Sequence, residues 1–168
     1  MASRQNWVLA AGGFGVFDAG INALSILTRI LPPPVFIGST DLFFPANRHA
    51  PIAADLTFDT GTRADQLLSA AFDWRETEKQ TWQIEVERTD GTTFKLADGG
   101  RRFETTRHAP FVGPADEYPD TYQDFAGLLG ASQSRMDATS FQLVADAFLV
   151  GSKIEVEAFS WVEHSHPG

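Results

Sequence analysis

No cysteine occurs among the 168 residues of the chain, and positive charge is scarce, with thirteen basic side chains against twenty-two acidic ones. The lack of cysteine excludes a disulfide framework, a thiolate metal site and a thiol nucleophile, and it fits a reducing compartment. The formal net charge of −9 opposes non-specific attraction to nucleic acid and to anionic lipid. We therefore expect neither nucleic acid nor a membrane as a partner, and we take the cytoplasm as the default location.

Long hydrophobic runs are also missing. Residues 1–4 are polar, and the apolar run that follows is short and broken by glycine, so it matches neither a secretory signal nor a membrane span. The hydrophobic fraction is nevertheless 43%, which is enough for one ordinary core in 168 residues and too little for two full domains. The composition predicts one compact, soluble domain over residues 1–168.

Hydrophobic periodicity predicts a helix near the start of the chain and then a run of strands. Apolar residues recur at helical spacing from Ala19 to Leu31, and the three prolines that follow end that helix. The expected strands, in chain order, are Val35–Phe44, Ile52–Phe58, Leu67–Arg75, Thr81–Arg88, Thr92–Leu96 and Arg101–Glu104. Alternation of apolar and polar residues, clearest in the segment WQIEVERT, indicates a sheet with one buried and one wet face.

After a loop rich in proline and glycine, at Ala109–Pro114, the periodicity returns to that of helices. Apolar residues mark one helix between Tyr118 and Leu129, and a second between Phe141 and Val150 that continues toward Ile154. A helix, about six strands and two helices, without regular βαβ alternation, predict an α+β domain. We expect a largely antiparallel, open-faced sheet with helices packed on one face.

The most informative segment reads GGFGVFDAGINALSILT, from Gly12 to Thr28. It combines a glycine-rich turn, an aspartate and an apolar helix. Asp18 and Asn22 are four residues apart and lie on one face of that helix, so one ligand can contact both. The alternative is structural: an aspartate before an apolar helix is a favoured N-cap, with Asn22 assisting in the first turn.

The sequence resembles the C-terminal domain of the glucose-fructose oxidoreductase and inositol dehydrogenase (Gfo/Idh/MocA) family, and within it the aldose 1-dehydrogenases that act on D-galactose or L-arabinose. The resemblance rests on the segments AGGFGVFDAGINALSILTRILP, PANRHAPIAADLTF, FDWRETEKQTWQIEVERTDGTTFKLADGG, EYPDTYQDFAGLL and LVADAFLVG. Together these segments span nearly the whole chain.

The resemblance implies a two-domain enzyme, in which a Rossmann domain binds the nicotinamide cofactor and a sheet domain supplies substrate contacts and the subunit interface. We find only the second domain in this sequence. The one glycine cluster, Gly12–Gly15, lacks the third glycine of the G-x-G-x-x-G pattern, and the lysine that the family carries in its Rossmann half is missing. We expect NAD or NADP to serve the full-length enzyme and no cofactor to bind this chain alone.

By the same resemblance, Asp18 and Asn22 are the catalytic and substrate-binding residues. Much of the family has histidine where Asn22 stands, and because an amide does not act as a base near neutral pH, Asn22 would orient the sugar rather than titrate. Many relatives have proline where Ala19 stands. Trp74 and Trp82 are further candidates, as an apolar platform for the sugar ring, although an aromatic residue on an alternating strand is more often part of a core or an interface.

The histidines give weaker signals. His49 and His108 fall in turn-like segments, and we expect them to be solvated. His164 and His166, beside Glu163, resemble a weak metal cluster at a polar chain end, but we predict no metal site.

We therefore predict the substrate-binding and oligomerisation domain of an NAD(P)-dependent aldose 1-dehydrogenase, which oxidises the C1 hydroxyl of a sugar to a lactone and is inactive alone. The expected partners are an aldose, a second copy bound through the sheet face, and a Rossmann domain, which a separate chain could supply. One alternative is a non-catalytic module that binds sugar or only dimerises. Another is a scaffold whose exposed sheet face binds a different protein.

Overall fold

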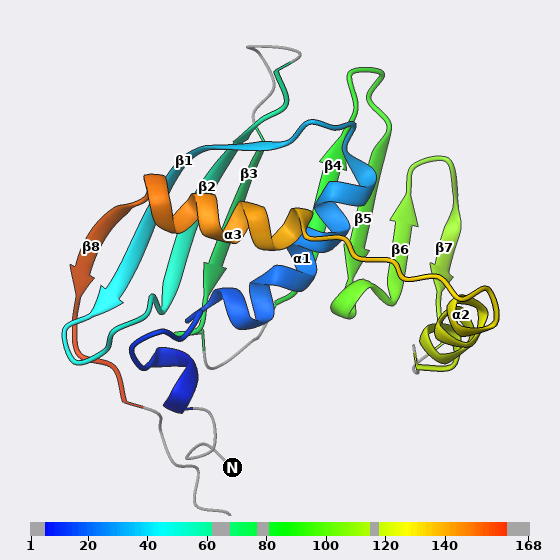
Figure 1. The fold of residues 1–168 in the computed structure, drawn as a ribbon. Helices are drawn as coiled ribbons and strands as arrows, with labels where there is room; N and C mark the ends of the chain where they lie inside the picture. Colours follow the sequence, from blue (N-terminus) through cyan, green and yellow to red (C-terminus); the bar gives the residue numbers. More distant parts are fainter. Residues whose placement is uncertain (1–5, 62–67, 77–80, 115–117, 161–168) are drawn as a thin grey trace, which may run out of the picture. The chain divides into compact units, whose positions relative to one another are not determined.

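The structure is a computed structural model, shown in Figure 1, that describes residues 6–61, 68–76, 81–114 and 118–160. The chain divides into two compact units, one formed by Met1–Thr77 with Ala138–Gly168 and the other by Glu78–Asp137. We describe each unit by itself. The single domain over residues 1–168 stays a prediction.

The first unit is a four-stranded sheet with two helices on one face (Figure 1). Its strands β1 (Phe36–Pro45), β2 (Ala53–Asp59) and β3 (Leu68–Asp73) are antiparallel neighbours, and β8 (Ser152–Val156) runs parallel to β1 at the edge. Helices α1 (Phe17–Ile30) and α3 (Thr139–Val150) cover the same face of this sheet and pack on each other. A short 3-10 helix, η2 (Asn6–Leu9), precedes α1.

Strand alternation creates the core between this sheet and its helices. Thr40, Leu42 and Phe44 of β1 are buried, whereas Ser39 and Asp41, which alternate with them, are exposed on the opposite face, which we call the open face. The core residues of the sheet and helices are Val16, Phe17, Leu24, Leu42, Phe44, Ala54, Leu56, Phe58, Leu143, Val144 and Ala147. Since each fully buried large apolar side chain contributes on the order of 2 kcal/mol, this cluster is the main stabilising element of the unit.

The second unit is an antiparallel meander followed by a helix. Its strands β4 (Gln83–Glu87), β5 (Thr93–Ala97), β6 (Arg102–Thr105) and β7 (His108–Val112) pair in sequence order, with the one-turn 3-10 helix η3 (Asp98–Gly100) before β6. Helix α2 (Tyr118–Gly130) completes the unit and has no fully buried residue.

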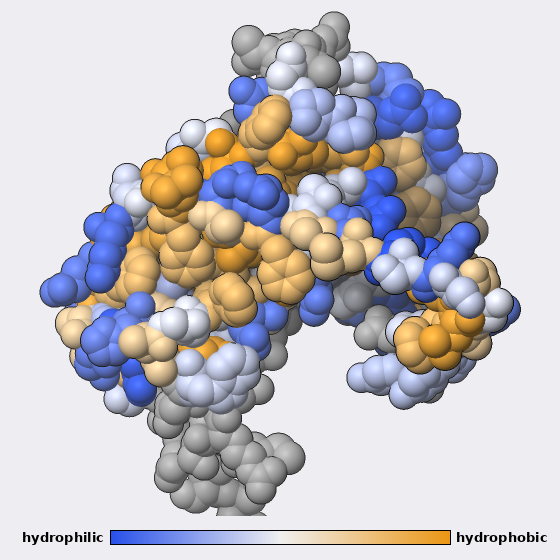
Figure 2. All heavy atoms as spheres, in the orientation of Figure 1, coloured by the Kyte–Doolittle hydropathy of each residue, from blue (hydrophilic) through white to orange (hydrophobic). Residues whose placement is uncertain are grey.

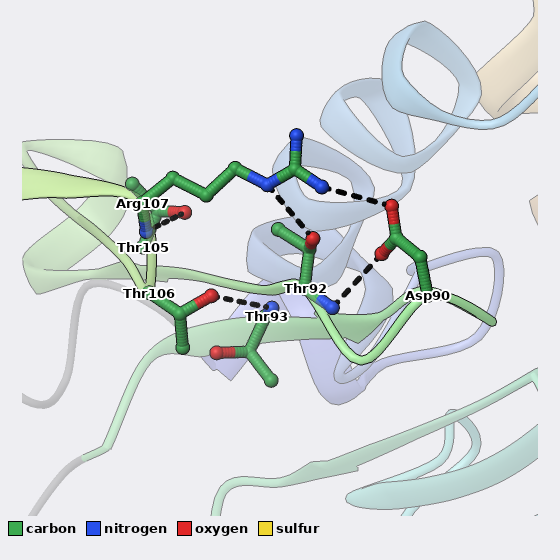
Figure 3. Close-up of polar contacts among 6 residues, drawn as sticks. All are labelled: Asp90, Thr92, Thr93, Thr105, Thr106 and Arg107. Carbon is green, nitrogen blue, oxygen red and sulfur yellow. Dashed lines mark hydrogen bonds and ion pairs between the residues drawn. The ribbon is translucent and has the colours of Figure 1, made fainter.

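Two turns at one end of the second sheet are joined by side chains (Figure 3). Asp90 lies in the β4–β5 turn, where Gly91 has a φ of 75°, as the predicted Asp-Gly hairpin requires. Arg107, in the β6–β7 turn, donates from Nη2 to Asp90 Oδ2 and from Nε to the Oγ1 of Thr92, both at 3.0 Å. The turns are therefore held together by one guanidinium.

The α+β class is confirmed, and each predicted helix and strand is found within a few residues of its expected bounds. Three details of the prediction are wrong. The strands form two four-stranded sheets rather than one sheet of about six. The loop expected at Ala109–Pro114 is mostly β7, an edge strand, where Pro110 is tolerated because the outer side needs no ladder hydrogen bond.

The third error concerns the end of the last helix, which stops at Val150 and does not continue toward Ile154. Gly151 has extended dihedrals, and the chain then forms β8 beside β1. A Cβ at Gly151 would lie 2.5 Å from the carbonyl oxygen of Ala147, so the reversal needs glycine. Within the described ranges, no helix is long and apolar enough to cross a membrane.

Candidate functional site

The glycine turn before α1 is wedged between η2 and the segment around Pro51. Gly15 has a φ of 57°, and a Cβ on it would lie 2.1 Å from the Pro51 carbonyl oxygen. Its amide donates to the Val8 carbonyl at 2.8 Å, and the Val16 amide donates to Pro51 at 2.8 Å. The start of α1 is therefore fixed by backbone contacts that leave no room for a side chain.

Aromatic packing sets the direction in which α1 leaves this turn. The buried ring of Phe17 makes edge contacts with Phe72 of β3 and Phe148 of α3, with centroid distances of 5.9 and 5.6 Å. Gly20 lies against the Phe72 ring, where a Cβ would be 3.2 Å from the nearest ring atom. These contacts turn one face of α1 toward the sheet and leave the other outside.

Asp18 and Asn22 lie on that outer face, and both are exposed. The face continues through Ser25 and Arg29, which are also exposed and follow at helical spacing. Within the described residues, neither the Asp18 carboxylate nor the Asn22 amide is held by a side-chain hydrogen bond or an ion pair, so both have capacity for a ligand. The structure thus gives the two residues the common face that their spacing predicts.

The N-cap alternative for Asp18 is wrong. Val16 is the N-cap and Asp18 is the second residue of the helix, with its amide donating to Gly15 at 3.0 Å. Asn22 lies in the second turn rather than the first.

Three amides of the glycine turn are already bonded within the chain. A pyrophosphate needs free backbone amides at the helix start. Here the amides of Gly13, Gly15 and Val16 donate to carbonyls of Ala10, Val8 and Pro51. These three amides are therefore not available to the phosphates of NAD or NADP.

The two tryptophans predicted as a sugar platform are both half-buried. Trp74 follows β3, donates its amide to Ile52 at 3.1 Å, and packs against the core cluster and against a second cluster of Val8, Leu9, Ile52 and Ala53. These contacts favour the core alternative for Trp74. Trp82 directly precedes β4 in the second unit, and its part in sugar binding stays a prediction.

The structure describes two of the four histidines, His49 and His108. His49 and His108 are exposed, as expected, but His108 lies in β7 rather than in a turn. Glu163, His164 and His166 fall outside the described residues. Over the ranges that the structure describes, no three metal-binding side chains are grouped as a metal site requires.

A hollow of about 440 Å³ in the second unit contains none of the predicted site residues. It lies along α2 and is lined by Asp120, Gln123, Asp124, Gly127, Leu128 and Gln133. Arg135 pairs with Asp124 at its edge.

Two aromatic residues beside the glycine turn were missed in the sequence interpretation. Trp7 is 57% exposed and Phe14 is 46% exposed, although their neighbours Val8, Leu9, Val16 and Phe17 are at most 1% exposed. The available signal was an aromatic residue on each side of a glycine turn that leads to Asp18.

With the geometry established, comparison with known proteins gives the class of the chain, an α+β domain of dehydrogenase type. The solved D-galactose-1-dehydrogenase from Rhizobium etli superposes with a TM-score of 0.81 and 46% identity over 93% of this chain and 49% of its own. The 3-ketoreductase KijD10 from Actinomadura kijaniata, solved with NADP and TDP-benzene, shares the fold with a TM-score of 0.69 and 15% identity, over 87% of this chain and 50% of its own. No protein-family profile matches the chain.

A sequence relative narrows the class. The galactose 1-dehydrogenase of Pseudomonas fluorescens is 38% identical over 155 residues, which are 92% of this chain and 50% of that protein. The chain thus matches the C-terminal half of galactose 1-dehydrogenases, in agreement with the resemblance to the Gfo/Idh/MocA family. It spans about half the length of these relatives.

Proposed function

We propose that this chain is the substrate-binding and oligomerisation half of an NAD(P)-dependent aldose 1-dehydrogenase of the D-galactose or L-arabinose type. The observation that carries the proposal is the exposed pair Asp18 and Asn22, held on one helix face by a rigid glycine turn, in a chain homologous to galactose 1-dehydrogenases. The reaction removes the C1 hydroxyl proton and a hydride from C1 and leaves a lactone.

The contribution of this chain is to bind and orient the sugar. A carboxylate accepts hydrogen bonds from sugar hydroxyls, and an amide both donates and accepts, so Asp18 and Asn22 together fix the C1 end of the ring. The two Cα atoms are one helical turn apart, roughly 6 Å, so both side chains can reach the same sugar ring. Holding C1 in a single orientation lowers the entropic cost of hydride transfer.

We expect the cofactor to be held elsewhere, because the amides of Gly13, Gly15 and Val16 already donate to backbone carbonyls. Bound by a Rossmann domain, NAD or NADP would supply the hydride acceptor. Such a domain could belong to the same polypeptide or to a separate one. In its absence we expect this chain to bind sugar without turnover.

Calorimetric titration of the chain with D-galactose, L-arabinose and D-glucose tests the proposal. Asp18→Asn and Asn22→Ala should each weaken binding by roughly tenfold or more, which corresponds to the loss of one charge-assisted or two neutral hydrogen bonds. Asp120→Asn is the matched control, because Asp120 is also an exposed aspartate in the first turn of a helix. Equal effects of the Asp18 and Asp120 changes would contradict a specific site on α1.

Adding the separately produced N-terminal half of the Pseudomonas relative then distinguishes the enzyme from the alternative. Nicotinamide reduction that depends on both halves and on Asp18 supports the dehydrogenase. Sugar binding that never yields reduction supports a non-catalytic sugar-binding module.

We also propose that two copies associate through the open face. Its centre carries small side chains, including Ser39, Thr57, Ser69 and Ala71, which allow a second sheet to approach to about 10 Å. Ile154, which is 37% exposed, adds apolar area beside them. This surface favours an isologous sheet-to-sheet contact.

A further inference from the structure

We infer that Phe14, assisted by Trp7, forms the aromatic platform on which the apolar face of the sugar ring stacks. The inference rests on the proposed sugar site at Asp18 and Asn22 and adds two residues to it. It places the platform beside α1 instead of at Trp74, which is half-buried and packs against two core clusters.

Phe14 lies close to Asp18 in the chain. Its carbonyl accepts the Phe17 amide at 3.2 Å, and the neighbouring Gly15 carbonyl accepts the Asp18 amide at 3.0 Å. Phe14 is therefore in the turn that directly precedes Asp18. Its side chain is exposed, four residues before the exposed Asp18.

Trp7 lies in η2, which contacts the backbone next to Phe14. Gly13, next to Phe14, lies against the end of η2, where a Cβ would be 2.7 Å from the Trp7 carbonyl oxygen. The Trp7 carbonyl also accepts the Ala10 amide at 3.1 Å. The backbones that carry the two aromatic residues are thus in contact and are fixed to each other.

The exposure of the two aromatic side chains is unfavourable for a protein in water. The same short segment buries Val8, Leu9, Val16 and Phe17 almost completely, yet it leaves its two other large apolar side chains about half exposed. Exposed aromatic residues on a rigid frame beside hydrogen-bonding groups are typical of ligand sites. Folding of this unit gains little from their rings, whereas a ligand would gain from stacking on them.

D-Galactose has one ring face that is suited to stacking on an aromatic side chain. In D-galactose the axial C4 hydroxyl projects from one face of the ring and leaves the C3, C4 and C5 hydrogens together on the other. That apolar patch fits a flat aromatic ring, while the hydroxyls at the ring edge remain available to Asp18 and Asn22. D-Glucose has an equatorial C4 hydroxyl and lacks this patch, so the platform would also favour galactose over glucose.

The test is calorimetric titration of the chain with D-galactose and D-glucose, together with saturation-transfer NMR of bound galactose. Phe14→Ala and Phe14→Leu should weaken galactose binding by about tenfold and reduce the preference over glucose. Trp7→Ala should have a smaller effect, and Trp7→Phe should retain binding but abolish the sugar-induced change in tryptophan fluorescence. Phe111→Ala, at a 62% exposed aromatic residue of β7, is the matched control and should bind as the original chain does.

The outcomes separate this inference from the function on which it rests. Saturation transfer strongest at the C3, C4 and C5 hydrogens, lost in Phe14→Ala, supports the platform. Unchanged affinity in both Phe14 variants, with binding still lost in Asp18→Asn, overturns the platform and leaves the sugar site standing. Absence of sugar binding to the original chain overturns both.

Discussion

At the scale of single residues, the position of Asp18 depends on a glycine that touches no ligand. Gly15 has a positive φ and lies against Pro51, and the first turn of α1 follows directly from it. We predict that Gly15→Ala lowers the free energy of unfolding by about 2–4 kcal/mol, because it adds left-handed strain and a 2.1 Å overlap. Urea unfolding followed by circular dichroism measures the change.

Gly127 is the control for that prediction. It lies inside α2, and a Cβ there would meet no atom within 4 Å. Gly127→Ala should stabilise the chain by about 0.5–1 kcal/mol through helix propensity alone. Similar destabilisation by both substitutions would show that the Gly15 contact is not the cause.

A second residue-scale prediction concerns the pair of Asp73 and Arg75 on the open face. The hydrogen bond from the Arg75 side chain lowers the pKa of Asp73 below its ordinary value of 3.8. The pair therefore stabilises the fold at pH values above 3.8, and this contribution is lost as the pH falls through the lowered pKa. Because both side chains are more than one third exposed, we expect Arg75→Gln to cost less than about 1 kcal/mol at pH 7.

Unfolding free energies of Arg75→Gln, Asp73→Asn and the double variant, at pH 7 and pH 2, check this pair. The double variant should be no less stable at pH 7 than either single variant, and the differences should vanish at pH 2. A cost of Arg75→Gln that persists at pH 2 would have to come from packing on the Phe43 ring, which the guanidinium approaches to 5.9 Å.

At the scale of elements, Arg107 connects two hairpin turns that are 17 residues apart in sequence (Figure 3). We predict that Arg107→Ala increases amide hydrogen exchange several-fold at Thr93 and Thr106, whose amides bond across the same end of the sheet. Hydrogen bonding by Thr92 lowers the pKa of Asp90, so its carboxylate keeps its charge, and the bridge with it, at pH values down to the ordinary 3.8.

Arg102→Ala is the control for the bridge. Arg102 pairs with Glu104 in its own strand, so its loss removes an arginine and an ion pair without separating any turns. Faster exchange at Thr93 and Thr106 in both variants would mean that a general loss of charge, rather than the bridge, controls the turns.

The elements were predictable to the extent that their signal is local. The apolar stripe of α1, the alternation of β4 and the Asp-Gly turn each lie within about ten residues, and each was predicted correctly. β8 was not, because the strand SKIEV is defined by pairing with β1, more than 100 residues earlier, and only Gly151 marks the break locally. The division of the strands into two sheets was not predictable either. It depends on β3 and β4 not pairing with each other, which no local sequence pattern shows.

The common helix face of the two candidate site residues was predictable for a similar reason. Asp18 and Asn22 share a face because they are four residues apart on one helix, which needs no tertiary information. Whether an aromatic side chain is exposed does need it. Trp7 and Phe14 were overlooked because their exposure results from the packing of η2 against Gly13 and Gly15, and Trp74 was proposed because its burial was not visible in a strand pattern.

At the scale of the whole molecule, apolar and charged surfaces lie on opposite sides of the first unit. Figure 2 shows hydrophobic side chains gathered over α3, whose exposed apolar residues include Phe141, Phe148 and Leu149. On the open face, Asp41 and Asp55 are direct cross-strand partners, and Asp73 and Arg75 lie on β3 and just after it. Asp59, at the end of β2, is exposed on the same face, so four carboxylates and one guanidinium leave three net negative charges per copy.

These charges predict how the proposed dimer responds to salt. Two sheets packed about 10 Å apart would bring six net negative charges together, and the Debye length is about 10 Å at 0.1 M salt but only 3 Å at 1 M. We therefore expect a weak dimer at low ionic strength that strengthens as salt is added. Asp41→Asn combined with Asp55→Asn should strengthen it without salt, because it removes the facing carboxylates, whereas Ile154→Glu, at an exposed apolar residue of the same face, should abolish it. Sedimentation velocity at tens of micromolar protein distinguishes these cases.

A dimer that weakens with salt would point to contacts between opposite charges on another surface, and a monomer under every condition would contradict association through the open face.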